Sequence, residues 1–244
     1  MNRYYCDLHI HSCLSPCGDE DSTPQNIAGM ATLCGLNIVA LTDHNTTKNC
    51  PAFFKAAKKH GIIPIAGLEL TTSEDIHVVC LFENLEDAMS FDTHLQTRRF
   101  LIENRPEIFG RQLILDENDE IVGEEEHLLI NATDISIDEA YSLLRKFNGV
   151  AYPAHIDKKA NGFISVLGDI PPDSEFLYYE LHSTENIDIY SKKYGIDKNR
   201  FIVSSDAHYL TDLRDKEFYF ELDDEPYSSA KVRSELFKKL RGGI

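Results

Sequence analysis

The sequence lacks the long apolar runs that cross a lipid bilayer. None of its hydrophobic stretches approaches the roughly 20 residues that a membrane-spanning helix needs. Its first ten residues, MNRYYCDLHI, also lack the basic and apolar regions of a secretion signal. We therefore expect a cytoplasmic protein that makes no contact with a membrane.

Closely paired cysteines are absent as well. No cysteine belongs to a C-x-x-C pair, which argues against a zinc ribbon and against a thioredoxin-type redox motif. In a protein without a secretion signal, these thiols are expected to be reduced. The cysteines all lie in the first third of the chain: Cys6, Cys13, Cys17, Cys34, Cys50 and Cys80.

Positive charge is scarce, since 24 lysines and arginines are set against 41 aspartates and glutamates, and the formal net charge is −17. Such a surface repels phosphate-rich polymers, so we expect neither broad nucleic-acid binding nor binding to anionic membranes. A small phosphorylated substrate is compatible with this charge. Two catalytic patterns are also missing, a glycine-rich phosphate loop and a Ser-His-Asp order.

What the sequence does contain is an alternation of short apolar runs and helix-like segments. The runs are rich in β-branched and aromatic residues and lack polar/apolar alternation, which is typical of buried strands. They cover residues 37–43, 62–70, 76–82, 149–155, 176–182 and 200–208. Helix-like segments lie between several of them, one capped by Thr23 and ended at Gly35, another opened by Ser136 with Glu139. This repetition predicts an α/β protein with a parallel sheet or barrel.

One segment, at about residues 91–134, breaks the alternation. A long polar helix candidate is followed by two apolar runs on either side of DEND (116–119), a hairpin pattern, and then by an acidic stretch. The segment is too short and too charged to bury a core of its own. We interpret it as an insertion and expect residues 1–244 to form a single domain.

Histidine occurs twice near the N-terminus, in DLHIHS at residues 7–12. In an extended strand the side chains of Asp7, His9 and His11 point to the same face. Two imidazoles on one face can chelate one ion while a carboxylate orients a ring or binds. On its own H-x-H is a weak signal, so a metal site requires further ligands from the rest of the chain.

Similar side chains occur at the ends of the other predicted strands. The motifs LTDHN, GLEL, IHVVC, AYPAH and SSDAH supply Asp43, His44, Glu69, His77, His155, Asp206 and His208. Functional groups of parallel α/β folds gather at the carboxyl ends of strands. Burial of so many unpaired ionisable groups would be costly, whereas cations would provide partners. Imidazole and carboxylate ligands suit zinc, manganese or iron.

Five motifs, DLHIHS, LTDHN, GLEL, PAH and SDAH, occur in this order and together resemble the signature of the PHP (polymerase and histidinol phosphatase) domain. The resemblance covers nearly the whole chain outside the segment at 91–134. It implies a distorted seven-stranded (β/α) barrel, TIM-like in plan, with two or three divalent metal ions in its mouth.

The resemblance also implies a ligand set for each ion. The first ion would be bound by His9, His11, Glu69 and Asp206. Glu69 would bridge to a second ion, which is bound also by His77 and His155. A third ion would be bound by His44, His208 and one residue of the loop after the first motif. Asp43 would orient a ligand instead of binding metal directly.

The sequence departs from the family pattern at two places. PAH is usually followed by proline, and here it is followed by Ile156. The loop SCLSPCGDED offers two candidates for the last ligand, Cys17 by its spacing and Asp19 by its chemistry. We favour Asp19, because many members of the family use a carboxylate there.

Further residues are candidates for contact with the substrate. His182, in ELHSTEN, follows a predicted strand and would face the mouth as a substrate contact or a general acid. Lys158, Lys159 and Arg214 would supply positive charge for a phosphate group.

The function that the resemblance implies is metal-dependent hydrolysis of a phosphate monoester or diester. Bound ions would generate hydroxide near neutral pH and neutralise phosphoryl oxygens. Glu69 would set the distance between ions, and Asp206 would accept a proton from the attacking water. The substrate class includes nucleotides, oligonucleotide ends and small phosphorylated metabolites, and the oligomeric state is left open.

Two other interpretations stay open. Amidohydrolases that cleave C–N bonds also begin a barrel with H-x-H, although they usually require a lysine or carboxylate bridge at a mid-barrel strand. Some domains of the PHP type are non-catalytic modules of larger polymerases, and such modules are expected to lose ligands. The near-complete ligand set favours an enzyme.

Overall fold

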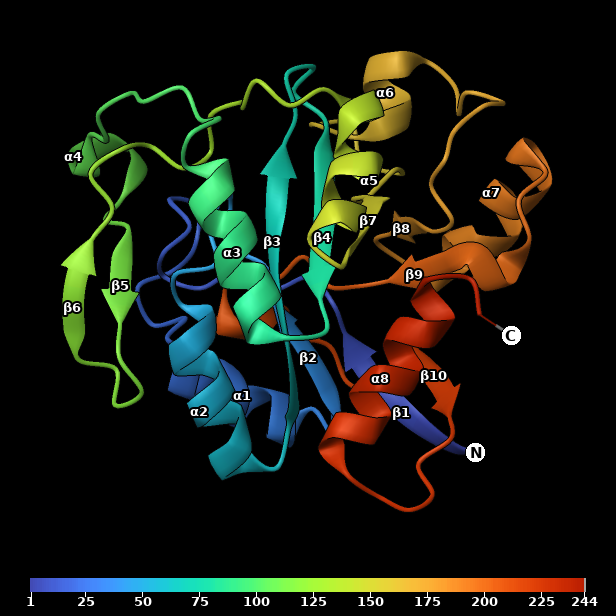
Figure 1. The fold of residues 1–244 in the computed structure, drawn as a ribbon, viewed down its shortest axis with the longest axis horizontal. Helices are drawn as coiled ribbons and strands as arrows, with labels where there is room; N and C mark the ends of the chain where they lie inside the picture. Colours follow the sequence, from blue (N-terminus) through green and yellow to red (C-terminus); the bar gives the residue numbers. More distant parts are fainter. Residues whose placement is uncertain (244) are drawn as a thin grey trace.

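The computed structural model describes residues 1–243, and its centre is a curled sheet of six strands (Figure 1). The strands lie in the order β10-β1-β2-β3-β4-β7. Their bounds are β1 (Asn2–Asp7), β2 (Ile38–Leu41), β3 (Ile63–Thr71), β4 (His77–Phe82), β7 (Gly149–Pro153) and β10 (Tyr219–Leu222). The predicted α/β class is confirmed.

The directions of the strands follow from the lengths of their connections. β1, β2 and β3 run parallel and are joined by α1 (Pro24–Leu33) and α2 (Cys50–His60). Only residues 72–76 join β3 to β4, and a link this short permits an antiparallel hairpin but no parallel crossover. The pairs β4–β7 and β1–β10 are antiparallel too. The sheet is therefore mixed, whereas a parallel one was expected.

Two further strands, β8 (Tyr179–Leu181) and β9 (Phe201–Val203), form a separate parallel pair. Hydrogen bonds link this pair to the main sheet beyond the carboxyl ends of the strands. The Ile156 N–H donates to the Glu180 carbonyl at 2.9 Å, and the His11 N–H donates to the Ala207 carbonyl at 2.9 Å. Because β8 and β9 lie outside the six-stranded sheet, the count of seven barrel strands stays a prediction.

Two helix starts lie at the predicted caps. Thr23 Oγ1 accepts from the Asn26 N–H at the start of α1, and Ser136 Oγ accepts from the Glu139 N–H at the start of α5 (Ile137–Lys146). The other α-helices are α3 (Leu85–Leu95), α4 (Pro106–Phe109), α6 (Phe163–Leu167), α7 (Ile187–Tyr194) and α8 (Ser229–Leu240). Within residues 1–243, no helix has the length and apolar character needed to cross a membrane.

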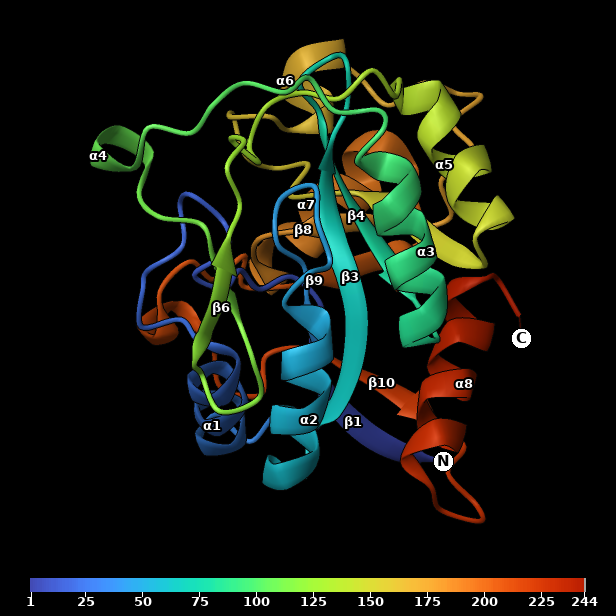
Figure 2. The ribbon, with the colours of Figure 1, turned by 60° about the vertical axis from the view of Figure 1, so that its left-hand side comes forward.

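The segment predicted as an insertion contains a two-stranded antiparallel sheet, β5 (Leu113–Leu115) and β6 (Ile121–Glu124), with DEND in its turn. It lies along one side of the molecule, away from α8 (Figures 1 and 2). The Asn49 side chain fixes it, because it donates to the Leu113 carbonyl at 3.1 Å and accepts from the Leu115 N–H at 3.0 Å. The Leu113 N–H donates to the Cys13 carbonyl, so the hairpin contacts the loop after the first motif.

Strand β3 runs through the core and is buried along its whole length. Leu68 and Leu70 belong to the same hydrophobic cluster as Phe53 of α2, whereas Ile65 belongs to a second cluster with Leu236 of α8. Full burial of each such side chain contributes about 1.5–3 kcal/mol. This packing fixes the backbone that carries Glu69 into the cluster described below.

Candidate metal centre

The predicted ligands meet at one edge of the sheet, because the parallel strands β1, β2, β3 and β7 all end there. His77 reaches the same edge by a different route, since it begins β4, which runs in the opposite direction. The residues brought together are His9, His11, His44, Glu69, His77, His155, Asp206 and His208.

Glu69 lies at the centre of this cluster and is 1% exposed. Its Oε1 is 2.8 Å from Nδ1 of His77 and 3.1 Å from Nε2 of His155. Its Oε2 is 3.0 Å from Nδ1 of His44. One carboxylate therefore faces imidazoles that come from three different parts of the sheet edge.

His9 and His11 face both Glu69 and a second carboxylate. Their Nε2 atoms lie 3.4 and 3.3 Å from Oδ1 of Asp206. Each is also 3.3 Å from a Glu69 oxygen, and the two nitrogens are 3.2 Å apart. Nζ of Lys158 lies 2.7 Å from the other oxygen of Asp206, so a cation already contacts the edge of the cluster.

The outer nitrogens of these two imidazoles are engaged elsewhere. Nδ1 of His9 is 2.9 Å from a carboxylate oxygen of Glu180, to which it donates. Nδ1 of His11 is 2.9 Å from Oγ of Ser15, whose hydroxyl donates to Asp43 at 2.8 Å. With a proton held at each Nδ1, Nε2 is the atom of each ring that faces the carboxylates of the cluster. Either a second proton on Nε2 or a metal ion placed between ring and carboxylate would offset the negative charge there.

Three groups of potential ligands have atoms within 4.8 Å of one another. They are His9, His11, Glu69 and Asp206; His44, Glu69 and His77; and His11, Cys17, His44 and His208. Because Glu69, His11 and His44 each belong to two groups, the three groups form one continuous site.

The loop ligand is the point at which the geometry departs from the predicted set. Cys17 belongs to the third group, and Asp19 belongs to none of the three. The Asp19 carboxylate accepts from the Asp21 N–H at 2.9 Å, so it is bonded within its own loop. The structure therefore favours Cys17 over the preferred Asp19.

Two further features of the cluster are those of a metal site: buried polar atoms that form no hydrogen bond, and distances between ligand atoms that suit a shared ion. Within residues 1–243, Nδ1 of His44 and Oδ1 of Asp206 are buried and form no hydrogen bond of suitable geometry, although ionisable side-chain atoms lie 3.0–3.4 Å from them. A buried polar group left without a hydrogen bond costs about 1–3 kcal/mol. Ligand atoms that share an ion through bonds of about 2.1 Å lie about 3.0–3.4 Å apart. Most separations around Glu69 and Asp206 fall in that range. The donors therefore fit divalent ions such as zinc, manganese or iron.

Electrostatics in the cluster favour positive charge. Burial lowers the pKa of His11, but Asp206 and Glu69 outweigh it and raise that pKa to about 9. For His44 and His208 burial prevails, which holds the pKa of His44 well below its ordinary range and lowers that of His208 to about 4. The last two rings are thus neutral at pH 7, the form that binds a metal.

Glu180 is a residue of the site that sequence analysis missed. It lies in β8, is 1% exposed and accepts from His9. The available signal was its position in the apolar run FLYYELH, because a carboxylate in a buried strand is costly without a partner.

His182 lies against Arg214 and not among the ligands. Nη2 of Arg214 is 2.7 Å from Nε2 of His182, and the His182 N–H donates to Asp157 at 2.9 Å. Burial, together with Lys158 and Arg214, lowers the pKa of His182. A neutral ring that accepts from Arg214 is poorly suited to donate a proton, so the geometry disfavours a general-acid role. Lys159 is exposed.

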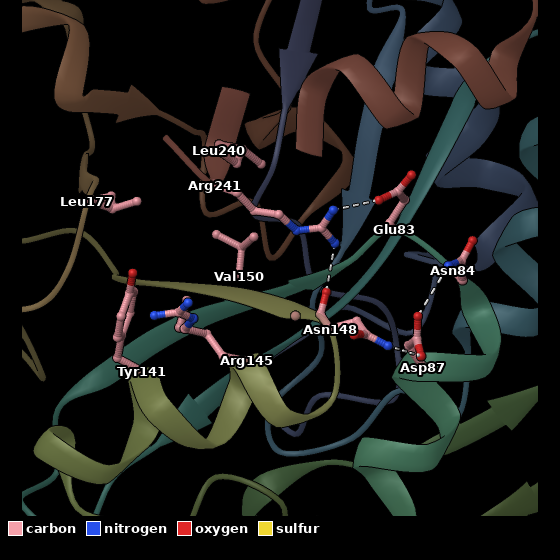
Figure 3. A pocket seen from close by; sticks show the side chains of 12 residues that line it. Glu83, Asn84, Asp87, Tyr141, Arg145, Asn148, Val150, Leu177, Leu240 and Arg241 are labelled. Atoms are coloured by element: carbon pink, nitrogen blue, oxygen red, sulfur yellow. Dashed lines mark hydrogen bonds and ion pairs between the residues drawn. The ribbon is translucent and has the colours of Figure 1, made fainter. Parts of the chain in front are cut away.

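A cavity of about 470 Å³ lies at the opposite end of β7 and contains none of the predicted ligands. Figure 3 shows Arg241 between Glu83 and Asn148, donating to the Glu83 carboxylate at 2.8 Å and to the Asn148 carbonyl at 2.9 Å. The side chains of Asn84 and Asn148 both donate to Asp87. Both carboxylates here, Glu83 and Asp87, have side-chain partners, and the Arg145 guanidinium lies 5.8 Å from the centroid of the Tyr141 ring, so the cavity needs no metal ion to satisfy its acidic groups.

Known proteins resemble this chain in sequence and in fold. The model of the PHP domain family matches residues 7–156. Endonuclease Q from Pyrococcus furiosus matches with a TM-score of 0.62 and 18% identity, over 99% of this chain and 56% of that one. A structure from Bifidobacterium adolescentis, described as a metal-dependent phosphoesterase, matches with a TM-score of 0.51 and 17% identity. The match covers 83% of this chain and 87% of that one. At these identities the two structures show a shared fold.

Relatives in sequence match parts of the chain. A 5'-3' exoribonuclease from Haemophilus influenzae is 34% identical over 117 residues, which are 46% of this chain and 40% of that protein. An uncharacterised protein from Methanocaldococcus jannaschii is 35% identical over 86 residues, 32% of this chain and 50% of its own length. The chain thus spans half or less of the length of these relatives.

One comparison corrects the prediction about partners. Endonuclease Q has also been solved in complex with a 27-mer duplex substrate that carries an abasic lesion at the active site, and that structure matches with a TM-score of 0.62. That complex points to nucleic-acid binding, so the prediction of a small phosphorylated substrate, such as a nucleotide or short oligonucleotide, with no broad nucleic-acid binding is wrong. It relied on the net charge of −17, a sum over the whole surface, whereas a phosphate backbone responds to local cations such as Lys158 beside Asp206.

Proposed function

Because the chain belongs to the PHP domain family, whose model matches residues 7–156, we propose that it is a metal-dependent phosphoesterase that hydrolyses phosphodiester bonds in nucleic acid. The observation that carries the proposal is the buried cluster around Glu69, where imidazoles and carboxylates face one another and ligand atoms lack other partners. The substrate class is supported by the DNA duplex bound to endonuclease Q and by the exoribonuclease name of a relative.

Two or three divalent ions are proposed to bind in the cluster. One would be held by His9, His11, Glu69 and Asp206. A second would be held by Glu69, His77 and His155. A third would be held by His44, His208 and Cys17. Such ions, when bound, activate water near neutral pH and offset the negative charge of a phosphoryl group.

The remaining residues are proposed to orient and charge the site. Asp43 fixes the His11 ring through Ser15, so its part is indirect. Lys158 would contact a phosphate oxygen, because its ammonium already lies at Asp206. Arg214 would add positive charge beside it, held in place by His182.

Asp206 is proposed as a ligand, and its earlier role as proton acceptor is disfavoured. Burial raises its pKa, but His9 and His11 outweigh burial and hold the pKa well below the ordinary range. A base of such low pKa accepts protons poorly near pH 7. A carboxylate that stays ionised is, in contrast, a ready metal ligand.

The fold supports the prediction of one domain with a seven-stranded barrel. The seven strands would be β1, β2, β3, β4, β7, β8 and β9, with β10 added at the edge of β1. The bonds from Ile156 to Glu180 and from His11 to Ala207 would close the barrel at its mouth. Residues 91–134 would be an insertion that borders the mouth, since Leu113 contacts Cys13.

The test is hydrolysis of labelled RNA, single-stranded DNA and duplex DNA by protein stripped of metal and reloaded with manganese, zinc or iron. Activity on at least one polymer is expected with metal, and the His9→Ala/His11→Ala variant should lose at least about 100-fold. A matched His60→Ala variant, exposed and on α2, should keep full activity.

Two outcomes would contradict the proposal. Undiminished hydrolysis by the His9→Ala/His11→Ala variant would separate the activity from the cluster. Hydrolysis of amide substrates, with none of phosphate esters, would favour the C–N hydrolase.

A further inference from the structure

Glu180 lies beside the cluster and belongs to none of the three ligand groups found in residues 1–243, yet its side chain contacts two histidines of the cluster. Its Oε1 accepts from Nδ1 of His9 at 2.9 Å and from the backbone N–H of His155 at 3.1 Å. Its Oε2 is buried with no partner in the described residues. The two hydrogen bonds that the Glu180 side chain accepts thus both come from histidines, His9 and His155, whose rings face Glu69.

The bond to His155 fixes an unusual backbone. His155 has a φ of 27°, in the region that residues with a β-carbon rarely adopt. A conformation of this kind costs about 1–3 kcal/mol and persists only where the surroundings hold it. Glu180 accepts from His155 with its side chain and from the next residue, Ile156, with its carbonyl. These bonds aim Nε2 of His155 at Glu69, 3.1 Å away.

The bond to His9 fixes a tautomer. A carboxylate that accepts from Nδ1 keeps the proton on that nitrogen and leaves Nε2 free to bind a metal. Nε2 of His9 is the atom that lies 3.3 Å from Glu69 and 3.4 Å from Asp206. His9 belongs to the first proposed ligand set and His155 to the second. Glu180 therefore has one oxygen in contact with both sets.

We propose that Glu180 is a positioning residue that couples the two ion sites, because a single carboxylate oxygen sets the His9 tautomer and the His155 backbone. The proposal rests on the proposed function, since it assumes that the cluster binds metal. Loss of this oxygen should weaken the first and the second ion together, although Glu180 touches neither ion.

The experiment measures metal affinity by chelator competition with zinc and manganese, in wild type, Glu180→Gln, Glu180→Ala and the control Glu185→Gln. Glu185 is exposed and lies in the turn after β8. We expect Glu180→Ala to bind two ions about 10–100-fold more weakly, the usual effect of losing a partner behind a metal ligand. Glu180→Gln keeps an oxygen that can accept both bonds and loses only the charge, so its affinity should lie between those of Glu180→Ala and wild type. The control should match wild type.

Double variants separate the effect of the Glu180–His9 bond from that of the Glu180–His155 bond. Glu180→Ala should still weaken binding in a His155→Ala background, through His9, and in a His9→Ala background, through His155. Unchanged affinity in folded Glu180→Ala, which removes the accepting oxygen, would overturn the proposal, as would weakening confined to one ion. Wild-type protein that binds no ion would instead overturn the proposed function.

A measurement on unaltered protein covers the case in which the variants fail to fold. In zinc-loaded wild type, nitrogen-15 spectra of the histidines should show His9 protonated at Nδ1 and ligated through Nε2. Ligation through Nδ1 would overturn the proposal.

Discussion

The two ends of strand β7 place ionisable groups in opposite circumstances. At the carboxyl end, His155 joins a buried cluster in which imidazoles and carboxylates crowd together and several atoms have no hydrogen-bond partner. At the amino end, Arg241 and Glu83 pair with each other, and their side chains are 43% and 21% exposed. The same strand thus begins at a polar cavity whose carboxylates, Glu83 and Asp87, are paired, and ends at a site that needs a further partner. Pairing, more than the number of charges, distinguishes a structural polar cluster from a binding site.

The sharpest test of this contrast exchanges one glutamate at each end for glutamine. Glu69→Gln should lose at least about 1000-fold in metal-dependent phosphodiester hydrolysis, because a neutral amide neither holds nor bridges cations as a carboxylate does. Glu83→Gln should keep its activity and lose only about 0.2–1 kcal/mol of stability, as expected for an exposed ion pair. Initial rates and urea unfolding measure the two effects. Equal activities of the two variants would erase the distinction.

Removal of metal should lower the stability of the protein only where the cluster around Glu69 is intact, and the state of the cavity beside Arg241 should not matter. An ion that binds the folded chain at 100 times its dissociation constant adds about 2.7 kcal/mol to the free energy of unfolding. We therefore expect chelation to lower the melting temperature of wild type and of Arg241→Ala by similar amounts, and to leave His9→Ala/His11→Ala nearly unchanged. Calorimetry with and without chelator measures this. An equal shift in the His9→Ala/His11→Ala variant would place the stabilising ions elsewhere.

Metal affinity should depend on pH, because ions and protons compete for the cluster. The pKa of His11 is raised to about 9, so without metal this imidazole holds its proton at pH 7 and must release it to bind an ion. Affinity should rise about tenfold per pH unit from pH 6 to pH 8 for each proton released. Titration calorimetry in buffers of different ionisation enthalpy counts these protons. Affinity that is flat over this range would contradict the proton release.

The smallest effect is expected at the loop ligand. With Cys17 in the third group, cobalt-loaded protein should show a sulfur-to-cobalt charge-transfer band, and Cys17→Ser should lose it and bind zinc more weakly. Cys34→Ser is the control, because Cys34 lies in the hydrophobic core outside the ligand groups. A band that persists in Cys17→Ser would return Asp19 to consideration.

Much of the site was accessible from the sequence because its residues stand at strand ends. Period-two spacing placed His9 and His11 on one face, and the apolar runs before Glu69 and His155 marked where strands would deliver them. The ligand roles themselves stay a proposal. What the sequence could supply was the convergence of the residues at the carboxyl ends of parallel strands. His77, at the start of β4, joins them because β4 runs in the opposite direction.

Most of the features that were missed depend on tertiary contacts. The reversal of β4 is the exception, because the apolar runs 62–70 and 76–82 are too close in the sequence for a parallel crossover, and the expected alternation of strands and helices obscured it. The choice between Cys17 and Asp19 depends on how a loop folds back, here through the bond from the Asp21 N–H to Asp19. Glu180 lies far from His9 in the chain, and only the packing of β8 beside β7 brings them together. A net charge, finally, carries no information on where the cations lie.

The most direct measurement is anomalous diffraction from crystals of the metal-loaded protein, recorded on both sides of the absorption edge of manganese or zinc. The account predicts two or three anomalous peaks within bonding distance of the cluster, with Glu69 touching at least two of the ions. Ions bound only at the cavity beside Arg241, or a cluster whose density holds water alone at saturating metal, would contradict it.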